Sequence, residues 1–296
     1  VRIEDTKPQP DAVDILAPEA LNGNVRRRGE DIRAGDTLIH KGTCCESGEL
    51  GVLAAQQYSV LPVYRRPTAA ILSTGDELVD LSDPLQAGKI VDSNTYALAA
   101  LCRTHGALPW MLPIVRDTEE ATRQAVETAL AADFILSSGG VSVGEYDFVK
   151  QVLDEMGAEA GLWRVSMKPG KPLFFCTLQD KPYFGLPGNP VSSMMSFLQF
   201  VRPAIRKASC YPEDEWLLPQ TTAIMDHAVE NRGDRRDYLR ARLAYDSGVL
   251  RATVFKGQGS HMLTSMLGAN GIVVLAPSQS VAKGAEATVQ IIGRVL

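Results

Sequence analysis

Hydrophobic and polar positions change their pattern twice along the chain. Residues 1–67 hold many prolines and glycines between short apolar stretches, which is typical of turns. Residues 68–209 alternate short apolar runs with longer stretches that begin at capping residues, a pattern of strands and helices. Residues 210–296 carry short apolar runs between turns and no convincing helix. We therefore predict a partial N-terminal domain, an α/β domain and a small C-terminal β domain with these boundaries.

The middle segment predicts strands that alternate with helices. The predicted strands are Thr68–Leu72, Leu108–Val115, Asp133–Ser138, Leu173–Leu178 and Tyr183–Leu186. The predicted helices run from Asp92 or Ser93 to Gly106, over Glu119–Ala131 behind a cap at Asp117 or Thr118, over Phe148–Met156, and from Pro190 to about Ser209, with Asn189 as N-cap. Such alternation predicts a mostly parallel sheet covered by helices on both faces.

The flanking segments predict less regular structure. In the first, Thr43 and Glu46 are interpreted as a capping box before a helix that runs to about Gln57. In the last, the predicted strands are Thr221–Met225, Tyr238–Leu243, Gly271–Leu275 and Ala287–Ile292.

Composition narrows the choice of partners. The 296 residues are 45% hydrophobic and 22% charged, as in an ordinary globular protein. A formal net charge of −5 gives no reason to expect nucleic acid or an anionic membrane, so local clusters of basic residues must hold any polyanion. Five scattered cysteines favour a reducing cytoplasm over a disulfide framework or a zinc site. No apolar run approaches the roughly 20 residues that span a bilayer, and no signal peptide is evident.

Four loops with unusual chemistry follow predicted strands. They are Ser73-Thr74-Gly75-Asp76-Glu77, Ser137–Asp147 (which contains Gly139, Gly140, Ser142, Gly144 and Glu145), Lys168–Pro172, and Pro187-Gly188-Asn189-Pro190. Because ligands of an open parallel sheet bind beyond the carboxyl ends of its strands, we expect these loops to form one site.

The chemistry of these loops suits phosphate esters. Glycine-rich turns expose backbone N–H groups to phosphate, and Lys168 and Lys171 flank a Pro-Gly turn that lets both ammonium groups face one anion. The acidic residues offer hard oxygen ligands for Mg²⁺; they are Asp76, Glu77, Glu145 and Asp147. Each loop alone is explained by a turn, a solvated surface or a helix cap. Four together favour phosphate chemistry assisted by Mg²⁺.

Two other motif classes would indicate a different chemistry. Gly140–Gly144 fits the GxSxG nucleophile elbow of hydrolases, with His227 and His261 downstream. A hydrolase gives no reason for the lysines and clustered carboxylates. Neither GxxxxGK[ST] nor GxGxxG occurs, which excludes the standard P-loop and Rossmann signatures.

The loop sequences resemble one family. STGDEL at Ser73–Leu78, DSN at Asp92–Asn94, SSGGVSVGEYDF at Ser137–Phe148, MKPGKP at Met167–Pro172 and GLPGNPVS at Gly185–Ser192 are similar to molybdopterin molybdenumtransferases, called MoeA in bacteria and related to the E domain of animal gephyrin. RRRGEDI at Arg26–Ile32 and GQGSHMLTSM at Gly257–Met266 extend the resemblance over nearly the whole chain.

The resemblance implies an elongated multidomain homodimer whose central domain binds the pterin. The implied reaction takes adenylylated molybdopterin and molybdate, releases AMP and leaves molybdenum on the dithiolene, with Mg²⁺ assisting. Asp76, Glu77 and Asp147 would position Mg²⁺, and Lys168 and Lys171 would hold phosphate or molybdate oxygens. Ser142 and backbone amides would complete the cradle, Pro187 and Pro190 would shape the wall, and Asp31 is a further candidate.

The resemblance leaves alternatives open. The family carries an N-terminal stretch, with an acidic motif that reaches the partner subunit, ahead of the part matched here. Gln57 and Cys176 stand where the family has glycine, so we expect effects on local packing there. An adenylyltransferase for the same pterin and a gephyrin-like scaffold remain possible readings, as does contact with other cofactor-synthesis proteins.

Overall fold

The computed structural model describes residues 1–17, 20–23, 25–140 and 148–295. The chain forms two compact units, Val1–Leu61 and Pro62–Leu296, and each is treated by itself. In the part of the chain that is described, no helix is both long and apolar enough to cross a membrane.

The first unit contains a short hairpin and one helix. A 3-10 turn, η1 (Ile3–Asp5), leads into β1 (Thr6–Pro8), which pairs antiparallel with β2 (Val13–Ile15). Helix α1 (Ser47–Ala55) begins later than the capping box at Thr43 predicts. Thr43 closes a turn by donating to the carbonyl of His40, and Glu46 and Glu49 form the reciprocal box instead. Gln57 follows the helix with a φ of 61°, the conformation for which glycine is the usual choice.

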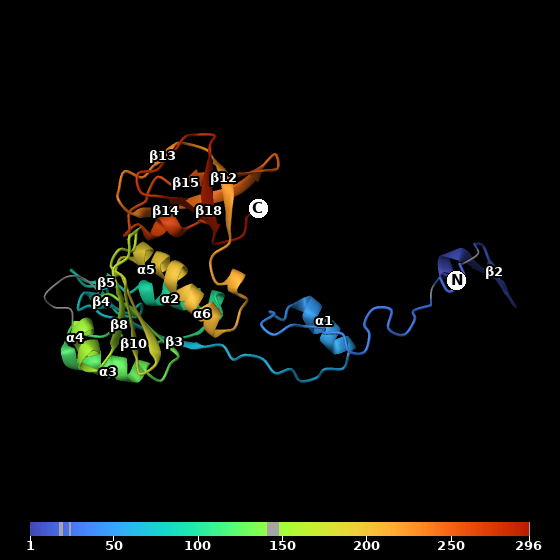
Figure 1. Ribbon diagram of the computed structural model, residues 1–296, viewed down its shortest axis with the longest axis horizontal. Coiled ribbons are helices and arrows are strands. Elements are labelled where there is room, and N and C mark those ends of the chain that lie inside the picture. The colour runs from blue at the N-terminus through green and yellow to red at the C-terminus, as the bar shows by residue number, and fades with distance from the viewer. Residues whose placement is uncertain (18–19, 24, 141–147, 296) are drawn as a thin grey trace. The chain divides into compact units, whose positions relative to one another are not determined.

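A six-stranded sheet forms the core of the second unit (Figure 1). Its order is β6 (Leu108–Met111), β3 (Thr68–Ser73), β7 (Phe134–Ser138), β11 (Lys181–Leu186), β10 (Phe174–Leu178) and β8 (Glu159–Trp163). The first four strands are parallel, as the alternating pattern predicts. The pairs β11–β10 and β10–β8 are antiparallel, and β8 was not predicted.

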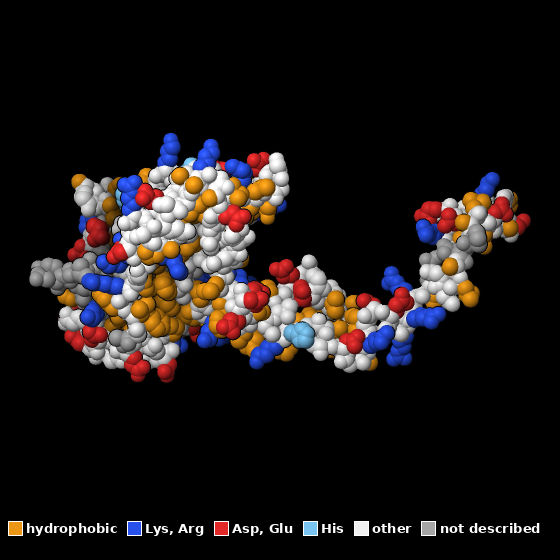
Figure 2. Space-filling model, turned by 45° about the horizontal axis from the view of Figure 1, so that its top comes forward, with side chains coloured by type: hydrophobic (Ala, Val, Ile, Leu, Met, Phe, Trp, Pro, Cys, Tyr) orange, Lys and Arg blue, Asp and Glu red, His pale blue; other side chains and the backbone are white. Residues whose placement is uncertain are grey.

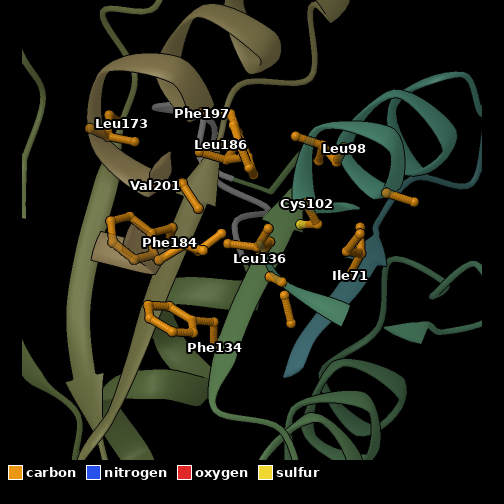
Figure 3. Packing of buried hydrophobic residues seen from close by; sticks show 14 residues of the cluster. Ile71, Leu98, Cys102, Phe134, Leu136, Leu173, Phe184, Leu186, Phe197 and Val201 are labelled. Carbon is orange, nitrogen blue, oxygen red and sulfur yellow. The ribbon is translucent and has the colours of Figure 1, made fainter. Parts of the chain in front are cut away.

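Helices cover both faces of this sheet, as predicted. One face packs against α2 (Asn94–Thr104) and α6 (Arg202–Ala208). Figure 3 shows this layer, in which Ile71 of β3 and Leu136 of β7 lie near Leu98 of α2. The other face packs against α3 (Glu119–Ala129) and α4 (Phe148–Glu155), and the buried Cys176 belongs to this layer. Its burial raises the pKa of the Cys176 thiol to about 12, which fits a packing role.

Proline shortens one predicted element and divides another, whose helical extent is as predicted. The strand predicted over Leu108–Val115 ends at Met111, and Pro113 lacks the N–H that a longer ladder needs. The helix predicted from Pro190 to Ser209 is divided into α5 (Pro190–Ser196), a π-helical turn η2 (Phe197–Val201), and α6. Pro203 provides no N–H for an α-helical bond to the preceding turn, which accounts for the change of helix type.

The last part of the chain closes into a small β-barrel. Its strands are β12 (Gln220–Met225), β18 (Glu286–Ile291), β16 (Gly271–Leu275), β14 (Arg236–Asp246) and β15 (Val249–Val254), and pairing of β15 with both β12 and β14 completes the circle. The interior is apolar. Strands β13 (Val229–Glu230) and β17 (Ser280–Val281) form a separate pair, and the short turns η3 (Glu213–Glu215) and η4 (Leu263–Met266) are 3-10.

The barrel packs onto the α/β layer of the same unit. Strand β9 (Met167–Lys168) leaves the α/β layer and pairs with β14. Met195 and Leu198 of the α5–η2 segment share a cluster with Tyr238 and Ile272 of the barrel. On the face drawn in Figure 2, acidic and basic side chains are interspersed, in keeping with the small net charge.

Candidate functional site

A pocket of about 470 Å³ lies at the carboxyl ends of β3, β7 and β11. The chain passes from β3 to β6 on one side and then returns past β3 to β7 on the other, so the sheet order reverses between β3 and β7. Ligands of open α/β sheets bind at such a reversal. The lining residues are Ser73, Thr74, Glu77, Leu78, Ile90, Val91, Asp92, Ser93, Asn94, Ser138, Gly139, Gly140, Pro172, Pro187, Gly188, Asn189 and Pro190.

Gly139 and Gly140 form the floor between β7 and β3. Both have positive φ, 92° and 65°. A Cβ on Gly139 would lie 2.7 Å from the Thr74 carbonyl oxygen, and one on Gly140 would lie 2.5 Å from a methyl of Val149. The Gly139 N–H donates to the Leu186 carbonyl, so β11 also fixes this turn. Only glycine fits this close approach, which leaves the backbone itself as the pocket surface.

Hydroxyl groups without protein partners lie beside the floor. The Thr74 Oγ1 is buried and has no hydrogen-bond partner among the described residues, and the same holds for Ser137 Oγ. Thr74 lines the pocket. A buried hydroxyl rarely stays unpaired, so this one is available to a ligand or an ordered water.

Asn94 and Asp92 belong to the pocket wall, which the site prediction had missed. The Asn94 amide donates to Ser138 Oγ and to the Gly188 carbonyl, each at 2.7 Å, and so joins two of the loops. Asp92 accepts from the Thr95 N–H and hydroxyl. In the sequence Asp92 is explained as a cap of α2, and Asn94 stands out only as part of the DSN motif, so neither was assigned to the site.

A group of carboxylates lies at one end of the pocket. Glu77 lines it, whereas Asp76 faces Asp117 through two reciprocal backbone-to-carboxylate hydrogen bonds of 3.3 Å. Burial, together with the charges of Asp76 and Glu77, raises the pKa of Asp117. Sequence reasoning took Asp117 only for a cap of α3. The structure adds it to the predicted Asp76 and Glu77.

This donor set is compatible with Mg²⁺ bound through substrate phosphates. The described residues contain no group of three or more His, Cys, Asp or Glu placed to hold a metal alone. Mg²⁺ usually takes one or two carboxylates and completes its shell with water and phosphate oxygens. Glu77 with its acidic neighbours supplies that minimum of hard oxygens, and their mutual repulsion would be relieved by a dication.

The predicted lysines do not line the pocket. Lys168 lies on β9, and its ammonium group bonds to the Asp237 carboxylate of β14 at 3.1 Å. Lys171 is exposed next to Pro172, which does line the pocket. The turn between the two lysines packs on α5, since a Cβ on Gly170 would lie 2.8 Å from Ser196 Oγ.

Part of the predicted site lies outside the described residues. These positions are Ser142, Gly144, Glu145 and Asp147. The GxSxG elbow falls largely on them, and neither His227 nor His261 is among the residues that line the pocket. Asp31 is exposed in the first unit.

Three family models match successive parts of the chain. The model described as MoeA N-terminal region (domain I and II) matches residues 1–56, the probable molybdopterin binding domain matches 70–207, and the MoeA C-terminal region (domain IV) matches 222–292.

Curated relatives cover nearly all of the chain. The molybdopterin molybdenumtransferase of Nostoc sp. is 40% identical over 280 residues, which are 92% of this chain and 63% of the relative. That of Haemophilus influenzae is 34% identical over 91% of this chain and 67% of its own length. The chain thus spans about two thirds of these relatives.

A solved structure agrees with the fold. A molybdopterin biosynthesis MoeA protein from Pyrococcus horikoshii superposes with a TM-score of 0.77 at 27% identity, covering 99% of this chain and 72% of the other.

Proposed function

Because the chain belongs to the molybdopterin molybdenumtransferase family, we propose that it inserts molybdenum from molybdate into adenylylated molybdopterin and releases AMP, with the aid of Mg²⁺. The single observation that carries the proposal is the pocket at the sheet reversal, where a bare glycine floor meets the unpaired Thr74 hydroxyl and the Glu77 carboxylate. A phosphoanhydride needs these elements: N–H and O–H donors for its oxygens, and a place for a dication.

Each residue in or near the pocket has a proposed role that follows from its position. Backbone N–H groups at Gly140 and Gly188 and the Thr74 hydroxyl bind phosphate oxygens, and Gly139 lets them approach the floor closely. Glu77, with Asp76 and Asp117 behind it, holds Mg²⁺, which when bound supplies positive charge to the phosphoanhydride. Lys171, exposed next to the pocket residue Pro172, would hold molybdate or phosphate oxygens as these enter, and Lys168 would do so on exchanging its bond to Asp237. Pro187 and Pro190 form the wall against which the substrate rests.

The proposal extends to the whole enzyme as a cytoplasmic homodimer. Five unpaired cysteines support a reducing compartment. Dimerisation rests on the family alone, and gel filtration with light scattering measures it.

A single-turnover assay tests the activity. The chain is mixed with adenylylated molybdopterin, molybdate and Mg²⁺, and AMP is followed by rapid quench. We expect molybdate-dependent release that falls about a hundredfold or more in Glu77→Gln, because the variant removes a metal-binding charge. Glu127→Gln, an exposed carboxylate on α3, serves as the matched control and should leave the rate unchanged. AMP release that ignores molybdate, or pterin binding without any AMP release, would contradict insertion chemistry.

A further inference from the structure

A buried chain of hydrogen bonds runs along the wall of the pocket formed by the start of α2. Asp92 is 5% exposed, Thr95 6% and Ser73 2%. The Thr95 hydroxyl lies 2.6 Å from Asp92 Oδ2, and Ser73 Oγ lies 2.8 Å from Thr95 Oγ1. The Asp92 backbone N–H donates to the Val79 carbonyl. This bond anchors the hydrogen-bond network to β4 (Leu78–Val79), beside β5 (Ile90–Val91).

The direction of each bond in this chain follows from its ends. A carboxylate only accepts, so the Thr95 hydroxyl must donate its single proton to Asp92. Thr95 Oγ1 then has only lone pairs left for Ser73, and the Ser73 hydroxyl must donate to it. Ser73 therefore presents lone pairs, and no proton, to the pocket that it lines. Asp92 also lines the pocket and has carboxylate lone pairs beyond those that Thr95 uses.

Asn94, which lies between Asp92 and Thr95 in the sequence, makes contacts of the reverse polarity. Gly188 offers only a carbonyl to Asn94, so the Asn94 amide nitrogen must face it, and its second N–H donates to Ser138 Oγ. Ser138 thereby accepts from Asn94, and it lines the pocket together with Thr74, whose hydroxyl has no partner among the described residues. The pocket thus has the unpaired Thr74 hydroxyl at its floor and the acceptors Asp92 and Ser73 at the α2 wall.

Apolar groups border the acceptor wall. Leu78, Ile90 and Val91 of the β4–β5 pair line the pocket beside Asp92, and Pro172 lines it as well. Apolar side chains around a few directed polar atoms suit a flat heterocycle, whereas a sugar would leave the apolar surface uncovered.

We infer that the Asp92–Thr95–Ser73 hydrogen-bond network recognises the amino and imino N–H edge of the pterin ring, while the phosphates lie on the glycine floor beside the Thr74 hydroxyl. This inference rests on the proposed function and gives the substrate a direction in the pocket. The pterin edge carries adjacent N–H donors in a guanidine-like arrangement, which matches a carboxylate. Adenine offers a single amino donor between acceptor nitrogens, so it matches this wall poorly.

Two probes separate the two halves of the pocket. Neopterin carries the pterin ring without phosphate, and AMP carries phosphate without a pterin. Their affinities are measured by calorimetry for the full chain and for Asp92→Asn, which keeps the shape but removes the charge and replaces one accepting oxygen by an NH2 group. We expect neopterin affinity to fall about tenfold or more, as for a lost hydrogen bond to a charged group, and AMP affinity to change less than about twofold. Asp154→Asn, an exposed carboxylate on α4, is the matched control.

Thr95 provides a second arm that separates recognition from folding. Thr95→Val breaks the network of hydrogen bonds and should also lower the affinity for neopterin. Thr95→Ser keeps the hydroxyl and should bind neopterin as tightly as the unmodified protein. Loss of AMP binding with neopterin unchanged would place the nucleoside at this wall and overturn the inference. An equal fall in the affinities for neopterin and AMP would mean that the hydrogen-bond network only caps α2 and does not recognise the pterin. If the unmodified protein bound neither probe, the proposed function itself would fail.

Discussion

At the scale of single residues, the glycine floor of the pocket is the place where the structure most strictly requires one amino acid. Gly139 combines a φ of 92° with a Cβ position 2.7 Å from a backbone oxygen, which cannot move aside. We expect Gly139→Ala to lower the free energy of unfolding by about 2–4 kcal/mol, from backbone strain together with the clash. Urea unfolding measures this, and AMP binding should be lost with it because the floor is displaced.

Gly248 is the matched control for this prediction. It has a φ of 81° in the β14–β15 turn, with open space where a Cβ would be placed. Gly248→Ala should therefore cost only the backbone term, about 1 kcal/mol, and leave AMP binding intact. Equal losses in the two variants would mean that the approach of Gly139 to Thr74 is unimportant.

His105 makes stability depend on pH. It follows α2 with its ring 5.9 Å from that of Phe197, and burial, with the nearby charges of Arg202 and Arg206, lowers its pKa to about 4. The unfolded chain binds this proton near pH 6.5, so the contribution of His105 is complete above that pH and is lost as the pH falls toward 4. We expect this loss to be about 1–2 kcal/mol at pH 4.5 after allowance for partial exposure.

The pH effect is measured as a difference between proteins. His105→Gln should unfold in urea with a weaker dependence on pH between 7.5 and 4.5 than the parent protein. His40→Gln, at an exposed position, should keep the dependence of the parent. Parallel curves for the parent and His105→Gln would show that the pKa of His105 is the same in the folded and the unfolded chain.

Pocket residues could be predicted from the sequence where helix capping or another local structural role did not already account for them. Gly139, Gly140 and Glu77 drew attention as glycine turns and paired acids after strands, and they line the pocket. Asp92 and Asp117 were hidden because helix capping explains an aspartate at such positions completely. Which lone pair or proton a side chain turns toward a pocket depends on contacts distant in sequence, such as that of Asn94 with Gly188.

At the scale of elements, Asp133 ties together the starts of two sheet strands. Its carboxylate accepts from the Thr68 N–H at 2.7 Å and hydroxyl at 2.9 Å, and pairs with both terminal nitrogens of Arg65 at 2.6 Å. These donors, Arg65 first, hold the pKa of Asp133 well below its usual range. Its contribution is therefore present at neutral pH and is lost as the pH falls below about 4.

We expect Asp133 and Arg65 to contribute differently to the free energy of unfolding. Asp133→Ala leaves the half-buried Thr68 donors unpaired and should lower the free energy of unfolding by about 2 kcal/mol. Arg65→Ala should lower it by less, because the Arg65 side chain is 73% exposed and solvent screens the ion pair. Urea unfolding of both variants and of the double variant measures the coupling. An equal or larger loss for Arg65→Ala would contradict this ranking.

The elements themselves were predictable to the extent that local pattern decides them. The four parallel strands and the helices on both faces follow from apolar runs and caps. The antiparallel β10–β11 pair turns at Gln179 and Asp180, both with positive φ, and these residues lack the asparagine–glycine signature of such turns. The closing strand β15 was missed because barrel closure is a long-range pairing that leaves little trace in local periodicity.

At the scale of the whole molecule, the pocket and the buried cores are concentrated in the second unit. Every residue that lines the pocket falls within Pro62–Leu296, and so do all four apolar clusters. Among the described residues before Pro62, Leu53 alone is a buried hydrophobic residue. The sequence motifs lie both before and after Pro62, so they did not indicate that nearly all buried apolar residues lie after it. A motif shows similarity of sequence and carries no information on how much surface its residues bury.

This division predicts that residues 62–296 fold and bind substrate without the first unit. We expect that fragment to unfold cooperatively, within a few degrees of the full chain in melting temperature, and to bind AMP within about threefold of it, since no pocket residue is removed. Residues 1–61 alone should show no cooperative transition, because they lack the apolar core that folding requires. Circular dichroism and calorimetry measure both. Loss of AMP binding in the fragment would show that the first unit shapes the pocket. Intact binding with AMP release abolished would instead place the contribution of the first unit in the reaction step.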